Sequence, residues 1–445
     1  MKIKKRLWLW AAILVTACCG CVRFRPDNSP GAGESEAGKQ EQILDTEPER
    51  RAETETEPEK QTAAETEPGQ DTEDENAARQ EGEAGTVSEE TIEEYIRSMT
   101  LEDKAAQLFI VMPESLIDGV SCVTAAGDMT REAINEIPVG GFIYARANLR
   151  SEDQVSAMTK NVQIYSMERV NLPMFLCIDE EGGTVARITK NDRFQVPYIG
   201  DMSDIGKTGD AETAYDTGRT MGTYLSRMGF NVDFAPVADV LSNPDNQVVK
   251  RRSFGSDPQL VSDMCLALAR GLREQGILSV YKHFPGHGGT AEDTHEGYAC
   301  TDKTLEELRI CDLIPFQEGI RQGVPMIMAG HVSLPGIAGD NTPASLSPAI
   351  LHDLLREEMG YEGIIITDAM DMGAVTKQYS AAEAAVRSLQ AGADMILMPA
   401  DLKEAYYGVI QAVRDGELTM ERIDQSLRRI IRVKLQMGAE GRDRN

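Results

Sequence analysis

Eight short apolar segments alternate with longer amphipathic segments over most of the chain, and this alternation limits the possible folds more than any other feature. The apolar segments cover residues 107–112, 141–145, 174–178, 232–237, 278–281, 326–329, 364–367 and 395–398. The helical spacing of apolar residues is found in residues 152–168, 211–228, 259–275, 305–321, 349–358, 381–391, 403–414 and 420–436. Eight strand–helix units over roughly 350 residues predict a single (β/α)8 barrel. A doubly wound open sheet is the alternative, but such sheets seldom contain eight units this regular.

Two further helices are expected before the first strand. Apolar residues at helical spacing follow Ser88, and Thr100 with Asp103 has the signature of a helix N-terminus.

Ionisable residues follow the predicted strands at the ends that a barrel uses for its active site. They are Asp179, Glu180 and Glu181 after the third strand, Asp239 after the fourth, Lys282 and His283 at the end of the fifth, His331 after the sixth and Asp368 after the seventh. Because the C-terminal ends of barrel strands meet at one rim, we expect these side chains to lie together. Charged groups gathered at one rim predict an enzyme site.

Residues 280–295 contain three of the five histidines in the chain. The predicted strand ends on Lys282 and His283, a glycine-rich loop follows, and Asp293 and His295 stand two residues apart beyond it. Glycine-rich loops with a structural histidine are common, but a strand that opens into so many charged groups favours a functional loop. His283, His287, Asp293 and His295 are also types that bind zinc, although we expect no metal and no other cofactor.

The N-terminal residues have the pattern of a secretion signal. Basic residues precede an apolar run, Leu7 to Ala17, that is too short to span a bilayer. The sequence Val15-Thr16-Ala17-Cys18 resembles a bacterial lipobox, which predicts a signal peptide over residues 1–17 and lipidation of Cys18. An ordinary cleaved signal peptide is the alternative. Either signal predicts export, and the lipid would anchor the protein to the outer face of the membrane.

Residues 18–87 are expected to form a disordered linker after the lipidated cysteine. Between Glu34 and Glu83 there are 18 acidic and 5 basic residues, and Thr-Glu-Pro recurs every ten residues. A segment with so few apolar side chains does not bury enough surface to offset its conformational entropy. The predicted barrel domain then covers residues 88–438, and residues 439–445 form a tail.

Composition argues against a nucleic-acid partner and does not decide how the cysteines pair. The formal net charge of -28 argues against a nucleic-acid partner, since a phosphate backbone requires a basic surface. No obligate protein partner is evident. Cys177 and Cys265 lie in apolar segments and are expected to be buried thiols. The sequence does not decide whether Cys300 and Cys311 form a disulfide.

Five motifs lie at predicted strand ends and a sixth, beginning at Arg252, lies in the loop after the fourth strand. They are Lys282-His283-Phe284-Pro285-Gly286-His287-Gly288 with Asp293-Thr294-His295, Ile178-Asp179-Glu180-Glu181-Gly182-Gly183 with Val185 and Arg187, Phe234-Ala235-Pro236-Val237-Ala238-Asp239-Val240, Arg252-Ser253-Phe254-Gly255, Gly330-His331-Val332 with Pro343-Ala344-Ser345-Leu346-Ser347, and Ile365-Ile366-Thr367-Asp368-Ala369-Met370-Asp371-Met372. Together they resemble glycoside hydrolase family 3, and within it the β-N-acetylglucosaminidase branch. The resemblance extends over residues 88–438.

The resemblance implies a retaining glycosidase with Asp368 as the nucleophile. Retention requires a carboxylate on one face of the sugar and a proton donor at the leaving oxygen. Asp368 also ends an apolar strand, whereas Asp371, three residues later, is at a position where an aspartate often caps a turn.

The resemblance also implies that His295 is the acid/base and that Asp293 orients it. Many two-domain relatives supply a glutamate from a second domain, but few residues follow the eighth strand here, so we expect the donor to come from the barrel. An imidazole titrates near neutral pH and is able both to give and to accept the proton.

The remaining rim residues are implied to hold the sugar. By resemblance, Asp179 binds hydroxyls of a terminal GlcNAc, and Lys282, His283 and Arg252 contact hydroxyls and the acetamido group or order the site. Arg187 is a further substrate-binding candidate, or a salt-bridge partner of Glu180 and Glu181. His331 is another, or it supports Asp368 from behind.

Three positions depart from the family pattern. Gly289 stands where Asp or Asn is usual, Thr294 where Ser is usual, and the pair Glu180-Glu181 where Gln-Glu is usual. The added negative charge is expected to raise the pKa of nearby carboxyl groups.

We therefore predict a lipid-anchored, extracellular β-N-acetylglucosaminidase that acts on peptidoglycan fragments through a glycosyl-enzyme intermediate. A β-N-acetylglucosaminide phosphorylase, a zinc-dependent hydrolase and a non-catalytic wall-binding lipoprotein are the alternatives. The intact set of Asp368, Asp293 and His295 argues against the non-catalytic protein, because a binding protein needs no nucleophile.

Overall fold

The computed structural model describes residues 87–290 and 299–440 of the chain, with side chains described as far as residue 437. Contacts divide the chain into two compact units, Met1–Gly69 and Gln70–Asn445, and only the second contains described residues. The predicted signal peptide, Cys18 and most of the acidic linker lie outside the described residues. Asp293, Thr294 and His295 also lie outside them.

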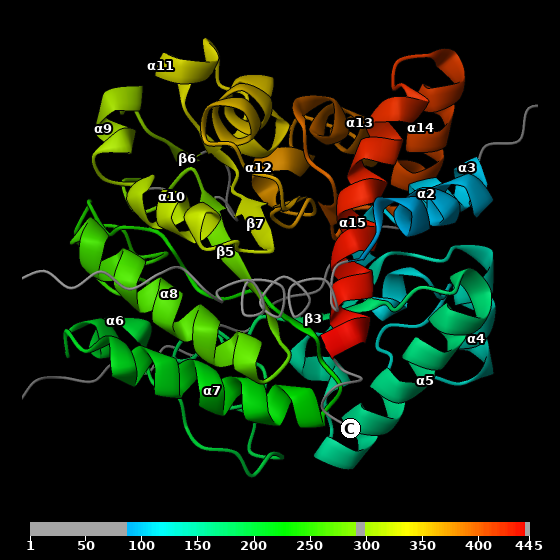
Figure 1. The fold of residues 1–445 in the computed structure, drawn as a ribbon, viewed down its shortest axis with the longest axis horizontal. Helices are drawn as coiled ribbons and strands as arrows, with labels where there is room; N and C mark the ends of the chain where they lie inside the picture. The colour runs from blue at the N-terminus through cyan, green and yellow to red at the C-terminus, as the bar shows by residue number, and fades with distance from the viewer. Residues whose placement is uncertain (1–86, 291–298, 441–445) are drawn as a thin grey trace, which may run out of the picture. The chain divides into compact units, whose positions relative to one another are not determined.

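Eight parallel strands form a barrel, as the sequence predicts (Figure 1). They are β1 (Phe109–Val111), β2 (Gly141–Ile143), β3 (Phe175–Ile178), β4 (Val232–Asp233), β5 (Leu278–Phe284), β7 (Met326–Ala329), β9 (Ile364–Thr367) and β10 (Ile396–Leu397). Each pairs with the next, and β10 also pairs with β1. A bridge between Ile366 and Met395 and a hydrogen bond from the Thr367 N–H to the Met395 carbonyl (3.1 Å) join β9 to β10. The barrel is therefore closed.

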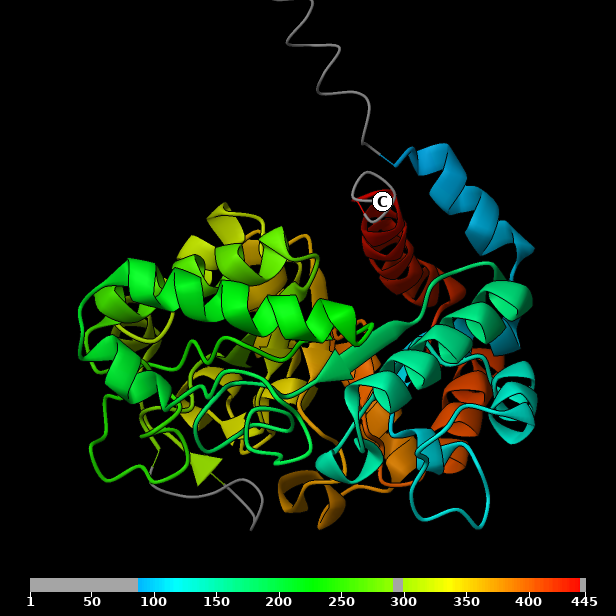
Figure 2. The same ribbon diagram turned by 90° about the horizontal axis from the view of Figure 1, so that it is seen from below.

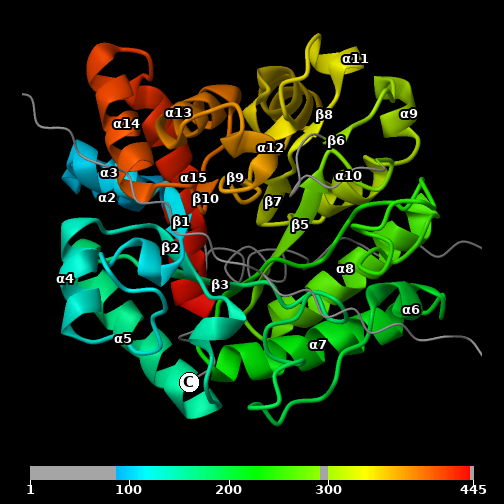
Figure 3. The ribbon, with the colours of Figure 1, turned by 180° about the vertical axis from the view of Figure 1, so that it is seen from behind.

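Helices surround this barrel, and Figure 3 shows them outside the ring of strands. They include α4 (Asp128–Glu136), α5 (Glu152–Val170), α6 (Met202–Gly206), α7 (Ala211–Arg227), α8 (Pro258–Glu274), α9 (Leu305–Arg309), α10 (Ile314–Arg321), α11 (Pro335–Ala338), the π-helix η4 (Ala349–Glu358), α12 (Gly373–Thr376), α13 (Ala381–Ala391), α14 (Leu402–Asp415) and α15 (Met420–Glu440). The single helix predicted over residues 305–321 is wrong, because the chain forms α9 and α10 there. Pro315 lies in the first turn of α10, where its missing N–H costs no hydrogen bond.

Two helices precede β1, where the sequence predicts them. The side chains of Ser88 and Thr100 accept backbone hydrogen bonds at the starts of α2 (Glu89–Ser98) and α3 (Leu101–Ala106). Helix α2 lies beside α15, as Figure 2 shows, and the ion pair between Arg432 and Glu89 (2.6 Å) joins them. The first and last described helices therefore pack together.

Helix α15 covers the N-terminal end of the barrel. The fully buried Lys434 donates a hydrogen bond from Nζ to Oε1 of Gln107 (2.8 Å), and its Nζ lies 5.0 Å from the ring centroid of Phe175. Gln107 precedes β1 and Phe175 begins β3. Burial lowers the pKa of Lys434 to about 7.

Three smaller findings complete the fold. Cys177 and Cys265 are buried, as predicted, and no disulfide joins Cys300 to Cys311. The short strands β6 (Ala299–Cys300) and β8 (Val332–Ser333) form a separate parallel pair. In residues 87–290 and 299–440, no helix combines the length and apolar character that a membrane span requires.

Candidate active site

The C-terminal ends of the barrel strands surround a cavity of about 320 Å3. Six of the predicted site residues line it: Asp179, Arg187, Arg252, Lys282, His283 and Asp368. A larger cavity of about 490 Å3 lies beside α8 and the start of β5, and none of the predicted site residues line it. We place the candidate site in the smaller cavity, because the ionisable groups converge there.

Asp179 is the first charged group of the site and follows directly after β3. Its two carboxylate oxygens accept from different cations, Oδ2 from Nη2 of Arg187 (3.0 Å) and Oδ1 from Nζ of Lys282 (3.1 Å). Asp179 and Arg187 are partly exposed, whereas the Lys282 side chain is only 3% exposed. Asp179 and Arg187 are therefore the members of this group that are most open to a ligand.

Glu181 lies behind Lys282 and holds two cations at once. One of its oxygens lies 2.6 Å from Nζ of Lys282, and both accept from the Arg252 guanidinium (2.7 and 2.8 Å). Burial alone would raise the pKa of Glu181, but Arg252 and Lys282 outweigh it and hold this pKa well below its usual range. Burial would lower the pKa of Lys282, but Glu181 and Asp179 outweigh burial and raise this pKa. Both side chains are therefore charged at neutral pH.

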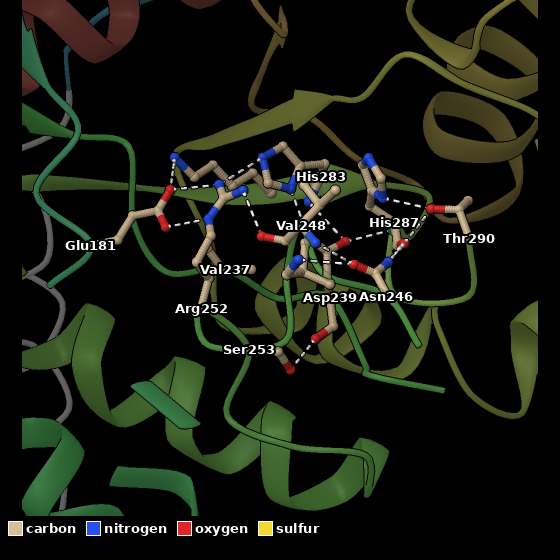
Figure 4. Close-up of polar contacts among 12 residues, drawn as sticks. Glu181, Val237, Asp239, Asn246, Val248, Arg252, Ser253, His283, His287 and Thr290 are labelled. Atoms are coloured by element: carbon tan, nitrogen blue, oxygen red, sulfur yellow. Dashed lines mark hydrogen bonds and ion pairs between the residues drawn. The ribbon is translucent and has the colours of Figure 1, made fainter. Parts of the chain in front are cut away.

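His283 joins this group to a second carboxylate, Asp239 (Figure 4). Its Nδ1 lies 2.7 Å from Oδ2 of Asp239, and its Nε2 lies 3.3 Å from Nη2 of Arg252. Because a guanidinium only donates, in the neutral form of His283 Nε2 accepts and Nδ1 carries the hydrogen that Asp239 accepts; when the ring is protonated, its charge faces Asp239. Burial raises the pKa of Asp239, but His283 outweighs it and the pKa is lowered. The sequence placed Asp239 at the rim but did not assign it this partner.

The glycine-rich loop after β5 is fixed from beneath by the segment that follows β4 (Figure 4). Asp239 Oδ1 accepts from the backbone N–H of His287 (2.6 Å), and Nδ2 of Asn246 donates to the His287 carbonyl (2.9 Å). Nδ1 of His287 lies 2.8 Å from the hydroxyl of Thr290. His287 is buried and holds the loop, which is the structural role that the sequence left open for it.

Asp368 lies on the opposite side of the cavity, directly after β9. Its backbone N–H donates to the Ala329 carbonyl at the end of β7 (2.8 Å), and its Oδ1 accepts from the Ala369 N–H (2.8 Å). Burial would raise the pKa of this carboxyl, but His283 and then His331 outweigh it and lower it. Asp368 is therefore ionised at neutral pH. The rise expected from the added negative charge is found at Asp233, whose pKa burial raises and Glu180 helps to raise, and not at Asp368.

His331 supports the segment that carries Asp368. Its Nδ1 lies 2.7 Å from the hydroxyl of Ser345, and its Nε2 lies 2.9 Å from the Ala369 carbonyl. Burial lowers the pKa of this imidazole. Since both ring nitrogens meet protein groups, the geometry favours the supporting role over direct sugar binding.

Most of the remaining wall of the cavity is apolar, although Asp371 also lines it. It is lined by Ile143, Val185, Val248, Met328, Met372, Leu397 and Met398. Met398 follows β10 in the left-handed region with φ 46°, which non-glycine residues seldom adopt away from functional sites. A ligand of mixed character, such as a sugar with an acyl substituent, matches one charged and one apolar wall.

Two local predictions require correction or comment. The Arg187 side chain pairs with Asp179 and not with Glu180 or Glu181; only its backbone N–H reaches Glu180. No group of three His, Cys, Asp or Glu placed to hold a metal occurs within the part of the chain that the structure describes. Asp293 and His295, two of the four zinc candidates, lie outside that part.

The sequence did not predict the partners of Glu181 and Asp239. Both were visible as acidic residues after predicted strands, but their partners come from other strands and loops. The pattern therefore predicts where these carboxylates lie and gives no sign of which cations they hold.

Comparison with known proteins places this barrel in a family. A sequence model of the glycosyl hydrolase family 3 N-terminal domain matches residues 100–433. The chain belongs to glycosyl hydrolase family 3. The matched residues contain every strand of the barrel and, among the described residues, every side chain that lines the cavity.

Two similar proteins carry the same kind of name. β-Hexosaminidase A of Pseudoalteromonas piscicida is 34% identical over 331 residues, which cover 69% of this chain and 55% of that protein. β-Hexosaminidase LpqI of Mycobacterium tuberculosis is 38% identical over 276 residues, which cover 59% of this chain and 68% of that protein. The chain thus spans little more than half of the Pseudoalteromonas relative.

Solved structures of similar proteins agree with this fold. A family 3 β-N-acetylglucosaminidase from a Paenibacillus species has a TM-score of 0.72 at 35% identity and covers 77% of this chain and 64% of that chain. The structure of M. tuberculosis LpqI has a TM-score of 0.66 at 32% identity, and the match covers 76% of this chain and 94% of that chain. The structure of the β-glucoside phosphorylase BglX has a TM-score of 0.70, and the match covers 80% of this chain and 62% of that chain. At 24% identity this likeness shows the fold alone.

Proposed function

We propose that this protein is a retaining β-N-acetylglucosaminidase that hydrolyses terminal, non-reducing GlcNAc from β-linked glycans. The observation that carries the proposal is the ionised Asp368, which faces the charged side of a rim cavity in a family 3 barrel. The names of the relatives, β-hexosaminidase and β-N-acetylglucosaminidase, support the same chemistry.

In this proposal Asp368 attacks the anomeric carbon of the bound sugar. Its carboxylate forms an ester with the sugar while the glycosidic C–O bond breaks, and the leaving oxygen takes up a proton. Water then attacks the same carbon, returns the carboxylate and gives up a proton, so that the configuration is retained. The lowered pKa suits Asp368 to this role, because a nucleophile must be deprotonated when the substrate binds.

Asp179 and Arg187 hold the sugar hydroxyls, and Lys282 completes the group. Asp179 accepts hydrogen bonds and Arg187 donates them, so the pair matches hydroxyls, which do both. Lys282, Glu181 and Arg252 are more deeply buried, and Lys282 holds Asp179 in place. The apolar wall with Met398 receives the acetamido methyl group.

The acid/base remains a prediction from the sequence. His295, oriented by Asp293, protonates the leaving oxygen in the first step and accepts the proton from water in the second.

The experiment is the substitution Asp368→Ala, assayed by release of p-nitrophenol from its β-GlcNAc glycoside. Turnover should fall by roughly 10⁴-fold or more, because covalent catalysis is lost. Added azide should restore part of the activity and yield the α-glycosyl azide, since the small anion fits where the carboxylate was removed. The matched variant Asp371→Asn should retain far more activity. Unchanged turnover in Asp368→Ala would remove this residue from the nucleophile role.

The product distinguishes hydrolysis from phosphorolysis. In phosphate buffer we expect free GlcNAc, whereas sugar 1-phosphate as the main product would show that phosphate is the acceptor and contradict the proposal.

We further propose that the substrate is a peptidoglycan fragment and that Cys18 carries a lipid at the outer face of the membrane. The sequence Val15-Thr16-Ala17-Cys18 and the acidic residues after it support a tethered, exported enzyme. Cells fed an alkyne-labelled fatty acid should label the wild-type protein and not Cys18→Ala. Label in both proteins, or in neither, would contradict the anchor.

A further inference from the structure

Asp179 and its neighbour Glu180 point in opposite directions after β3. Asp179 lines the cavity and contacts the side chain of Arg187, whereas Glu180 is fully buried and contacts the backbone of the same segment. Between Glu180 and Arg187 the chain turns back at Gly182 and Gly183, whose φ values of 87° and 49° lie in the left-handed region. The two carboxylates therefore hold one loop from its two sides.

Four donors converge on the Glu180 carboxylate. Oε2 accepts from the backbone N–H of Arg187 (2.6 Å) and of Ile188 (2.9 Å). Oε1 accepts from the N–H of Thr189 (2.8 Å) and from the hydroxyl of Tyr224 on α7 (3.0 Å). Three consecutive backbone N–H groups thus depend on one buried side chain, which only an ionised carboxylate satisfies completely.

Among the described residues, the donors that the Glu180 carboxylate accepts from are backbone N–H groups and a hydroxyl, and none is a cation. Its own N–H donates to Oδ1 of Asp233 on β4 (2.9 Å), so its hydrogen-bond network leads to a second buried carboxyl group. Burial raises the pKa of Glu180, and it raises that of Asp233 much further. The three N–H groups and the Tyr224 hydroxyl oppose this rise for Glu180. The loop therefore both requires the carboxylate and stabilises it.

We propose that Glu180 is a positioning residue of the substrate site, whose carboxylate fixes the backbone of Arg187–Thr189 and thereby sets Arg187 against Asp179. The inference rests on the proposed function, because it assigns Glu180 to the sugar-binding side of that site. It adds a residue that does not touch the substrate and acts through Arg187.

The substitution Glu180→Gln separates the charge from the shape. An amide has one oxygen and one NH2 group, so in either orientation the NH2 group faces at least one of the three backbone N–H groups. The Tyr224 hydroxyl is able to turn and accept, but the backbone N–H groups are not. We expect KM for the p-nitrophenyl β-GlcNAc substrate to rise roughly tenfold, with kcat changed less than about threefold, because the variant loosens binding and not the chemistry.

A double-mutant cycle with Arg187→Ala tests the route of the effect. If Glu180 acts through Arg187, adding Glu180→Gln to Arg187→Ala should raise KM by less than about twofold. Equal losses in both backgrounds, or a loss confined to kcat, would overturn the proposal. KM does not depend on the amount of folded enzyme, so a variant that folds in low yield is still informative.

Tyr224→Phe is the matched control. It removes one donor from the same carboxylate and leaves the three backbone contacts, so we expect KM within about twofold of the wild type. A tenfold rise in KM for this variant would show that packing around Glu180, and not the loop contact, controls binding, and would also overturn the proposal.

Backbone hydrogen exchange in the wild-type protein needs neither a variant nor activity. The amides of Arg187, Ile188 and Thr189 should exchange much more slowly than those of Thr184 and Lys190, which are exposed in the same loop. Equally fast exchange would overturn the proposal. A wild-type enzyme without activity on the glycoside would defeat the proposed function instead, and the exchange result would still decide whether Glu180 holds the loop.

Discussion

At the scale of single residues, the site consists of carboxylates that each satisfy several donors. Asp239 has no exposed surface and three donors: the His283 ring, the His283 backbone (3.2 Å) and the His287 backbone. It sets the orientation of an imidazole at the cavity and the start of the glycine-rich loop together. Replacing one carboxylate oxygen of Asp239 therefore affects both the His283 imidazole and the glycine-rich loop.

We predict that Asp239→Asn is costly although the shapes are alike. If the amide NH2 faces Nδ1, His283 must shift its hydrogen to Nε2, which then meets the Arg252 guanidinium. We expect kcat/KM to fall by roughly tenfold or more and the free energy of unfolding to fall by about 1–3 kcal/mol. Glycosidase kinetics and urea denaturation measure the two effects.

Asp245→Asn is the control, because Asp245 is exposed in the same connection after β4. Its effect on stability should stay within about 0.5 kcal/mol. Equal behaviour of the two variants would mean that the contacts of Asp239 have no special weight.

At the scale of elements, the strands were more predictable from the sequence than the helices. All eight strands follow from apolar runs, since strands buried on both faces have no polar alternation to confuse the pattern. Residues 305–321 have one continuous apolar period, yet they form two helices, and Pro315 lies in the first turn of the second. The apolar periodicity indicates which face of a helix is buried, but it does not indicate where the helix axis changes direction.

Helix α15 carries a buried cation that the same periodicity does not reveal. Lys434 has a folded-state pKa of about 7 because it is buried, whereas the unfolded chain has the ordinary value near 10.4. Between these two pH values the unfolded chain binds a proton that the folded chain releases, so this residue makes stability increase as pH rises. The increase is up to about 1.4 kcal/mol per pH unit, and below pH 7 the full cost of charging Lys434 is present.

We therefore predict that Lys434→Met changes the pH dependence of stability. Between pH 7 and pH 9 the free energy of unfolding of the wild type should rise by about 2 kcal/mol relative to that of the variant, because only the wild type contains Lys434. Denaturant melts at several pH values measure this difference. Lys160→Met, at an exposed position on α5, should show no such trend. A difference that does not vary with pH would mean that Lys434 stays charged in the folded protein.

At the scale of the whole molecule, the site joins residues that lie far apart in the sequence. Asp179 comes from the end of β3, His283 from β5 and Asp368 from the end of β9. Barrel geometry explains why the rim residues were predictable: every strand end arrives at one place. Which carboxylate pairs with which cation was not predictable, because Arg187 and Arg252 come from loops whose course depends on packing.

The central claim is that Asp368 forms a covalent bond with the sugar, and trapping the intermediate tests it most directly. A 5-fluoro-GlcNAc fluoride slows both steps, because the ring fluorine destabilises the oxocarbenium-like transition state, while its good leaving group still lets the enzyme accumulate as the ester. Trypsin should release residues 357–377, which contain both Asp368 and Asp371, so fragment ions that break the chain at Ala369 and Met370 locate the sugar. We predict one sugar on Asp368; an adduct on Asp371, or turnover without any adduct, would contradict the account.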